Sequence, residues 1–298
     1  MSLSDLLPTL LNDPPPTHAF ELSEDGIAFA PVSQPALARF QPFEPGVLLV
    51  SPVHDNIQQP QVLLDHIHSI APGNGRKRRA AVILPDYCAR VAVLDFDTFP
   101  TNPDEQQALV RFRLKKSVPF EVETAVVSYA PQPRPSVSGE AGAAINVLAA
   151  VISFDVVQQY EAPFRAAGFH PGLVTTSSLA ALNLLAPTGI TLLVQLSGRV
   201  LSVLVLQGDA VHLARCVELE GVELEDIESV LHPTIAYIED ELKGRPGQIW
   251  LAGFGPNVND VAARWQKEWG VSVQPLRSRF GNPGNGTAGL LGYLESVA

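Results

Sequence analysis

The chain has 298 residues, of which 17% are charged, and its formal net charge is −11. That length predicts about two domains, each with its own hydrophobic core, and the negative charge argues against nucleic acid as the main partner. No uninterrupted apolar run reaches the roughly 18 residues that span a bilayer, and no secretory signal opens the sequence. We therefore expect a cytoplasmic protein.

The first 17 residues are separated from the rest by a run of prolines at 14–16. Leucines recur before those prolines at helical spacing, namely Leu3, Leu6, Leu7, Leu10 and Leu11. We interpret residues 1–17 as an arm that packs on the protein's own surface. The alternative is a segment that binds a membrane surface or a partner, although membrane-surface helices are normally basic and this arm has no Lys or Arg.

The next segments predict part of a sheet and a helix that covers it. Residues 19–32 predict a hairpin that turns at Glu24-Asp25-Gly26, and residues 46–50 predict a buried strand. Apolar residues on one face predict a helix over residues 60–70. The basic run Arg76–Arg79 is interpreted as a solvated loop, with contact to anionic lipid headgroups as the alternative.

Residues 80–171 carry a start or stop signal at each element. Strands are predicted over 80–84, 89–96, 118–129 and 145–153. Between the second and third, a helix is predicted to begin with Asn102 as N-cap and Pro103 at the first helical position. It ends in cations up to Lys116, which suit the negative end of a helix dipole. The order strand–strand–helix–strand–strand–helix predicts a compact α+β module, in which 118–129 pairs beside 145–153.

The second half of the chain predicts the order strand–hairpin–helix–strand–helix–strand–helix. The predicted ranges are 190–194, 200–217, 220–242, 248–252, a helix carrying Trp265 and Trp269, 271–274 and 286–297. Pro233 is expected to kink or split the 220–242 helix, because a proline inside a helix removes a backbone hydrogen bond.

Patterns typical of metal sites are absent from the sequence. Cys88 and Cys216 lie in apolar strands and are interpreted as buried thiols in a reducing compartment. His66 and His68 are two residues apart and so do not share a helical face. The acidic cluster between Glu218 and Glu228 is interpreted as a solvated helix face, with a cation site or a basic partner as the alternative.

The 80–171 module resembles the PilM family of type IV pilus assembly proteins, which are actin-like and related to FtsA. The residues that carry the resemblance are Leu84-Pro85, Glu105–Lys116, Val118–Glu123 and Ser128-Tyr129. The resemblance implies an α/β, actin-like (ribonuclease H-like) two-domain fold with an inserted α+β subdomain. The implied parts are an arm at 1–17, a first domain at 18–187 with the insertion at about 86–168, and a second domain at 188–298.

Actin-like proteins usually bind ATP between their domains, so the resemblance implies three places where nucleotide would touch this chain. The first is the turn at residues 20–26, where the family has a phosphate-binding loop. Glu24 and Asp25 put negative charge there. The second is Val194-Gln195-Leu196-Ser197-Gly198, where the family has Val-Asp-Ile-Gly. Gln195 replaces the aspartate that would position Mg²⁺, and an uncharged amide is a poor ligand for that ion.

The third place is Gly253-Phe254-Gly255, which corresponds to the glycine-rich turn that covers adenosine in the family. Phe254 either stacks on adenine or fills an empty cleft. The remnant nucleotide cleft therefore comprises Gln195, Ser197, Gly198, Gly253, Phe254 and Gly255. We expect a degenerate member of the family, a pseudo-ATPase that keeps the fold without hydrolysing ATP. No catalytic residue, metal or cofactor is expected, and ATP is possible but not favoured.

The resemblance implies a non-enzymatic cytoplasmic scaffold, peripheral at the inner membrane, of the type IV pilus assembly platform. In the family, a groove between the first two subdomains holds the N-terminal peptide of the membrane partner PilN. Here it would be lined by residues 46–53 and 84–127. Asp5-Leu6-Leu7-Pro8 in the arm resembles the start of such a peptide. Other pilus platform or motor proteins are further implied partners. The alternatives are a nucleotide-binding actin-like ATPase or sugar-kinase-like enzyme, and a GspL-like cytoplasmic protein of type II secretion.

Overall fold

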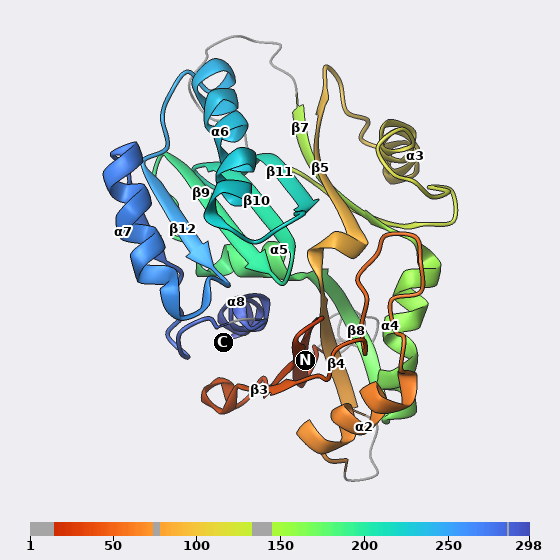
Figure 1. Cartoon of the computed structure of the whole chain (residues 1–298). Coiled ribbons are helices and arrows are strands. Elements are labelled where there is room, and N and C mark those ends of the chain that lie inside the picture. Colours follow the sequence, from red (N-terminus) through yellow and green to blue (C-terminus); the bar gives the residue numbers. More distant parts are fainter. Residues whose placement is uncertain (1–14, 74–77, 133–144, 285) are drawn as a thin grey trace, which may run out of the picture.

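The computed structural model describes residues 15–73, 78–132, 145–284 and 286–298 (Figure 1). Three sheets organise them, with strand orders β3-β2-β1-β4-β8, β11-β10-β9-β12-β13 and β5-β7-β6. The predicted N-terminal arm lies outside the described residues except for 15–17, and so do Arg76 and Lys77 of the basic run. None of the helices in the described ranges has the length and apolar character needed to span a bilayer.

The first sheet contains the predicted hairpin. Its strands are β1 (His18–Ser23), β2 (Gly26–Pro31), β3 (Arg39–Pro42), β4 (Arg78–Leu84) and β8 (Phe169–Thr176). β1 and β2 are antiparallel with Ser23 opposite Gly26, which confirms the hairpin and its turn. Gly26 is required there, because a Cβ would lie 2.4 Å from the carbonyl oxygen of Gln41.

Helices cover both faces of the first sheet (Figure 1). On one face lie α2 (Pro60–Ile70), as predicted, and α4 (Phe154–Ala166), whose Tyr160 and Phe164 share a core with Phe20 of β1. On the other face α8 (Ala288–Val297) packs on small residues such as Ala19 and Ala81. Two helices that the sequence assigned to the insertion and to the second domain, α4 and α8, thus complete the core of the first sheet.

The second sheet follows the order expected for the second half. Its strands are β9 (Ile190–Ser197), β10 (Val200–Gln207), β11 (Ala210–Glu218), β12 (Gln248–Ala252) and β13 (Ser272–Pro275). α6 (Leu224–Glu241) and α7 (Val258–Trp269) contribute Leu231 and Trp265 to its core. α6 runs through Pro233 without a split. Burial of Leu231, Thr234 and Ile238 holds the helix on both sides of the proline.

The third sheet belongs to the inserted module. It consists of β5 (Ala89–Phe96), β7 (Ile145–Ile152) and β6 (Val126–Pro131), with α3 (Pro103–Leu114) packed on it. The Oδ1 atom of Asn102 accepts from the backbone N–H of Asp104 at 2.9 Å, which confirms the predicted N-cap of α3. β6 pairs antiparallel with β7 from Val126 opposite Ile152, which confirms that the two predicted strands are neighbours. The predicted strand over 118–129 began too early, because the Arg111 side chain binds the carbonyl oxygens of Val122 and Ala125 in a turn region before β6.

The strand predicted at residues 46–50 is wrong. Leu48 makes only an isolated bridge with Ile57, flanked by backbone bonds from Leu49 to Asn56 and from Gln58 to Val47. The backbone N–H of Val50 then donates to Oε1 of Glu24 at 2.7 Å, so a side chain takes a group that a longer strand would have paired. The Nδ2 group of Asn56 donates to the carbonyl oxygens of Ser51 and His54, both at 2.8 Å, and so holds the turn that follows.

Candidate functional site

The first candidate is the cleft between the two large sheets, at the ends of β1, β9 and β12. We call it the central cleft; its lining residues include Glu21, Glu24, Asp86, Ser177, Gln195, Ser197, Gly253 and Gly286. Its cavity is only about 20 Å³, which is room for a single water molecule. Small-molecule sites are about 300–1,000 Å³. The central cleft is therefore closed to a nucleotide in this conformation.

Glu21 of β1 is the charged group at the centre of this cleft, and it is 2% exposed. Its Oε2 atom accepts from the backbone N–H of Leu290 at 2.7 Å, and its Oε1 atom accepts from Gly289 at 3.3 Å and from the Ser177 hydroxyl. Both amides belong to the first turn of α8, the positive end of the helix dipole. The protein's own carboxylate thus occupies this anion-binding position.

Burial raises the pKa of Glu21 to about 7, and the hydrogen bonds from Ser177 and the α8 amides oppose that rise without cancelling it. Desolvation thus outweighs the donors around the carboxylate. Glu21 consequently titrates near neutral pH.

Gln195 joins the second sheet to this network. Its Nε2 group donates to Oγ of Ser177 at 2.6 Å, and Ser177 donates in turn to Glu21. Its Oε1 atom is buried and has no hydrogen-bond partner among the described residues. A neutral amide at the position implied for a metal-holding aspartate thus serves as a hydrogen-bond link between β9 and β1.

The structure gathers the predicted residues around the cleft, but packing accounts for two of them. Ser197 and Gly253 line the central cleft, and Gly198, Phe254 and Gly255 line a neighbouring outer cavity. Gly253 has φ of +81°, and a Cβ there would lie 1.7 Å from the carbonyl oxygen of Leu196. The Phe254 ring lies 5.7 Å from the Trp265 ring, nearly perpendicular to it. Close strand approach requires Gly253, and Phe254 packs on Trp265.

The outer cavity has a volume of about 800 Å³, large enough for a small molecule. Its ionisable lining residues are Asp25, Glu223, Asp260 and Arg264. Arg264 is already paired, with Nη2 at 3.2 Å from Glu228. The carboxylates therefore leave a negative field in this cavity, which disfavours a polyphosphate. Within the described ranges, no group of three His, Cys, Asp or Glu side chains is placed to hold a metal ion.

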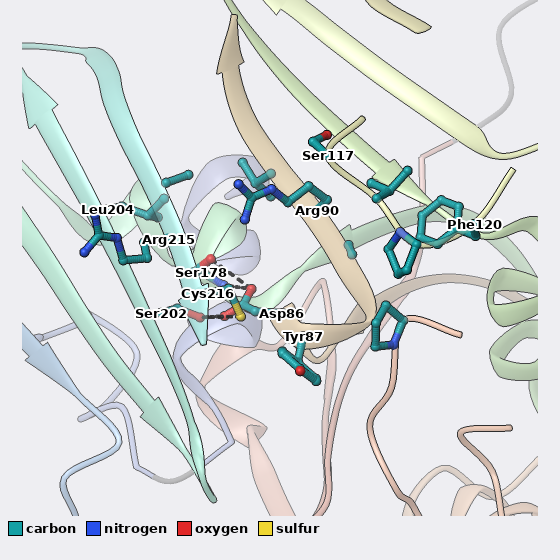
Figure 2. A pocket seen from close by; sticks show the side chains of 16 residues that line it. Asp86, Tyr87, Arg90, Ser117, Phe120, Ser178, Ser202, Leu204, Arg215 and Cys216 are labelled. Carbon is teal, nitrogen blue, oxygen red and sulfur yellow. Dashed lines mark hydrogen bonds between the residues drawn. The ribbon is translucent and has the colours of Figure 1, made fainter. Parts of the chain in front are cut away.

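A second candidate, which we call the side pocket, lies where all three sheets meet (Figure 2). Its volume is about 130 Å³. Pro52 comes from the loop beside the first sheet. The inserted module supplies η2 (Asp86–Cys88), the start of β5 and the loop 117–120 after α3. The wall opposite is formed by β10 and β11, through residues that include Ser202, Leu204, Ala214 and Cys216.

The side pocket coincides with part of the groove that the resemblance implied. Pro52 falls within the implied 46–53 range, and Tyr87, Arg90 and Phe120 fall within 84–127. The β10–β11 wall was missed, because contact between β5 and β11 joins positions far apart in sequence and leaves no local pattern.

Asp86 forms the floor of the side pocket and ties it to the second sheet. Its Oδ1 atom accepts from the backbone N–H and hydroxyl of Ser178, at 2.9 and 2.8 Å. Its Oδ2 atom accepts from the Ser202 hydroxyl at 2.8 Å. Burial raises the pKa of Asp86. Three donors thus bind this carboxylate, and one of them crosses from β10.

Cys216 lies beside Asp86, with its sulfur 3.6 Å from the Ser202 hydroxyl. Burial, together with the nearby Asp86, raises the pKa of the Cys216 thiol to about 12. Cys88 is a buried free thiol, and burial raises its pKa well above the usual value. The predicted burial is confirmed for Cys88, although it lies in η2 and not in a strand, whereas Cys216 on β11 is only half-buried. The raised pKa of each thiol keeps it protonated at neutral pH.

Comparison with proteins of known structure shows which fold the chain adopts. No protein-family model matches the sequence, and no curated protein matches it. Among solved structures, the chain is similar to PilM in a PilM–PilN type IV pilus biogenesis complex. The TM-score is 0.75 at 17% identity, over 94% of this chain and 98% of that one. It is also similar to a Bacteroides thetaiotaomicron protein with an actin-like ATPase fold and unknown function. That TM-score is 0.52 at 13% identity, over 92% and 94% of the two chains. These similarities confirm the predicted actin-like α/β fold.

Proposed function

We propose that this protein is a non-enzymatic scaffold of a type IV pilus assembly platform, and that its side pocket binds an extended N-terminal peptide of a PilN-like membrane partner. The observation that carries the proposal is the preformed side pocket of about 130 Å³ at the junction of three sheets. A cavity near 150 Å³ holds a benzene-sized group, so the pocket has room for one side chain of a peptide. A solved PilM–PilN complex with the same fold supports the choice of partner.

The strands around the pocket favour an extended peptide. β5 and β11 are each the outermost strand of their sheet, and the two strands lie next to each other. Neither pairs with a further strand on its outer side among the described residues, and such an edge is where an extended segment can add. The Gln132 side chain bonds to both backbone groups of Val211, at 2.7 and 2.8 Å, and so occupies the start of β11. The pocket lies at the other end of that strand, beside Ala214 and Cys216.

Apolar side chains near the pocket suit the leucines of such a peptide. Phe120 and Pro52 line the pocket itself. Leu49 and Val53, on the same loop as Pro52, are 57% and 44% exposed. Large apolar side chains that stay exposed near a preformed pocket are typical of binding surfaces.

The central cleft supports the non-enzymatic part of the proposal. Glu21 takes the helix N-terminus that would otherwise receive an anion, and Gln195 supplies no charge for a metal ion. Peripheral association with the inner membrane would follow from binding the membrane partner, because no described helix is suited to crossing the bilayer.

The test is a binding titration of the full chain with the N-terminal cytoplasmic peptide of the PilN-like protein encoded beside it. Ser117→Trp should block the pocket mouth, because Ser117 lines the pocket yet is exposed, and should weaken binding at least 100-fold. Ser128→Trp is the matched control, since Ser128 is exposed on β6 of the same module and away from the pocket. Absence of binding to the unmodified chain, or equal binding by the two variants, would contradict the proposal.

A nucleotide-binding protein is the second candidate, and one observation favours it: the outer cavity of about 800 Å³ is the size of a small-molecule site. The negative charge of its lining is the argument against it. A titration with ATP and Mg²⁺, described in the Discussion, decides between them.

A further inference from the structure

We infer that the side pocket selects a partner segment that carries an acidic side chain, Asp or Glu, and that Arg90 is the residue that pairs with it. The inference rests on the proposed function, because it names the chemistry of the segment that the pocket would hold.

Arg90 has no hydrogen bond or ion pair within the described residues. Other arginines of the structure are paired, such as Arg113 with Asp95 at 3.2 Å and Arg245 with Glu239 at 3.0 Å. The chain has 31 Asp and Glu against 20 Lys and Arg, so carboxylates are in excess. An arginine that meets none of them, although it lines a cavity, leaves its charge available to an anion from outside.

Arg90 also points the right way. Figure 2 shows its side chain reaching from β5 toward β10 and β11. Arg90 is an exposed residue that lines the pocket, so its guanidinium meets both the pocket and the solvent. Arg215 on β11 also lines the pocket, but its side chain extends in the opposite direction in the same view.

No ion pair joins Asp86 on the floor to Arg90 among the described residues, and Asp86 accepts from Ser178 and Ser202 instead. Much of the remaining lining is apolar and includes Val91, Leu204 and Ala214. A carboxylate that enters beside Arg90 therefore meets a charged donor at the solvent-facing edge of an apolar pocket, where an arginine–carboxylate pair contributes modestly.

A peptide carboxylate fits this pocket better than a free phosphate. Phosphate sites are commonly built on backbone N–H groups at a helix N-terminus. The helix N-terminus at this pocket, that of α5 (Ser177–Ala181), is occupied by Asp86, which accepts the Ser178 N–H. The guanidinium of Arg90 matches one planar carboxylate in the two-bond geometry that arginine favours.

The experiment uses two capped peptides that differ in one group, acetyl-Ala-Leu-Glu-Leu-Ala-amide and its Gln analogue. Each is titrated into the full chain while the side-chain Nε–Hε resonance of Arg90, assigned by its loss in Arg90→Lys, is followed by NMR. We expect the Glu peptide to shift that resonance and to bind about threefold tighter than the Gln peptide, a difference of about 0.65 kcal/mol, which is typical of an exposed ion pair. The preference should vanish in Arg90→Gln and persist in the control Arg245→Gln, which removes an exposed arginine outside the pocket.

Equal affinity of the Glu and Gln peptides, or a preference that survives Arg90→Gln, would overturn the inference. Displacement of the Glu peptide by millimolar inorganic phosphate at constant ionic strength would overturn it in favour of a phosphate site. The proposed function and this inference can be contradicted independently of each other. If the peptide of the PilN-like neighbour does not bind while the Arg90-dependent preference is seen, the partner is wrong and the acidic specificity stands. If that peptide binds and Ser117→Trp abolishes binding, but Arg90→Gln has no effect, the proposed function stands and the acidic specificity is wrong.

Discussion

In both the central cleft and the side pocket, a buried carboxylate accepts a hydrogen bond from the first turn of a helix. The two sites differ in the space that remains beside that carboxylate. In the cleft, Glu21 accepts from the first turn of α8, and about 20 Å³ of space remains. In the pocket, Asp86 accepts from the first turn of α5, and about 130 Å³ remains next to the unpaired Arg90. Among the described residues, the cleft lining contains carboxylates and no Lys or Arg. The pocket lining contains Asp86 together with Arg90, which has no ion pair in the described part of the chain, so we expect ligand binding in the pocket.

The largest effect that would sharpen this comparison is the loss of stability expected when Asp86 is replaced. Asp86→Ala leaves the Ser178 N–H and two hydroxyls without their acceptor. Unpaired buried donors cost about 1–3 kcal/mol each, so we expect the free energy of unfolding to fall by about 3 kcal/mol or more. Urea denaturation measures it. Asp86→Asn keeps one acceptor oxygen and should lose less than half as much; equal losses would show that these hydrogen bonds contribute little.

The next effect is the pH dependence that Glu21 confers. Because its pKa rises from 4.5 to about 7 on folding, the folded protein keeps a proton between those values that the unfolded chain has released. The free energy of unfolding should therefore fall as pH rises from about 5 to 8, by up to about 3 kcal/mol from this group. Asp86, whose pKa is also raised, contributes with the same sign.

Glu21→Gln should flatten that slope, because the amide does not titrate. Urea denaturation of the variant and the unmodified protein at several pH values measures the difference in slope, in which all other groups cancel. Identical slopes for the two proteins would mean that Glu21 stays charged in the fold.

A smaller effect is expected for Gln195→Leu. The substitution removes the bond from Nε2 to Ser177 but also removes a buried Oε1 that has no partner among the described residues. The two changes oppose each other, so the free energy of unfolding should fall by about 1 kcal/mol or less. A loss as large as that of Asp86→Ala would reverse the comparison and make the central cleft the stronger link between the sheets.

The smallest expected effect is that of ATP. Calorimetry with ATP and Mg²⁺ should give no binding, or a dissociation constant weaker than about 100 μM, near −5.5 kcal/mol. Tight binding, or phosphate release that depends on Gln195, would show that the cleft opens and that the nucleotide-binding candidate is correct.

Local signals accounted for the parts of the fold that were predicted correctly. Asn102 caps α3 because its side chain reaches amides two and three residues away, and the Gly26 turn is set by neighbouring residues. The 46–50 strand failed because Glu24 and Asn56, outside that segment, bind its backbone. Composition alone did not reveal those bonds.

The candidate sites depended on contacts between distant residues, and the sequence revealed them only in part. Gln195 and Gly253 were placed at the cleft by resemblance, but the hydrogen bonds that close the cleft come from Glu21, Ser177 and α8. Likewise Arg90 was unremarkable as one charge at the start of a strand. It becomes informative once the structure places it in the lining of the side pocket, opposite Ala214 and Cys216 of β11.

The position of α8 has a consequence for how the protein is made. The backbone N–H of Gly289 donates to Glu21 across 268 residues, and α8 covers the alanine face of the first sheet. During synthesis that face has no cover until α8 leaves the ribosome, so the first sheet is completed only after the strands of the second sheet have been made. Contacts of such long sequence separation slow folding and leave apolar surface exposed meanwhile. The nascent chain should therefore depend on chaperones until α8 has emerged.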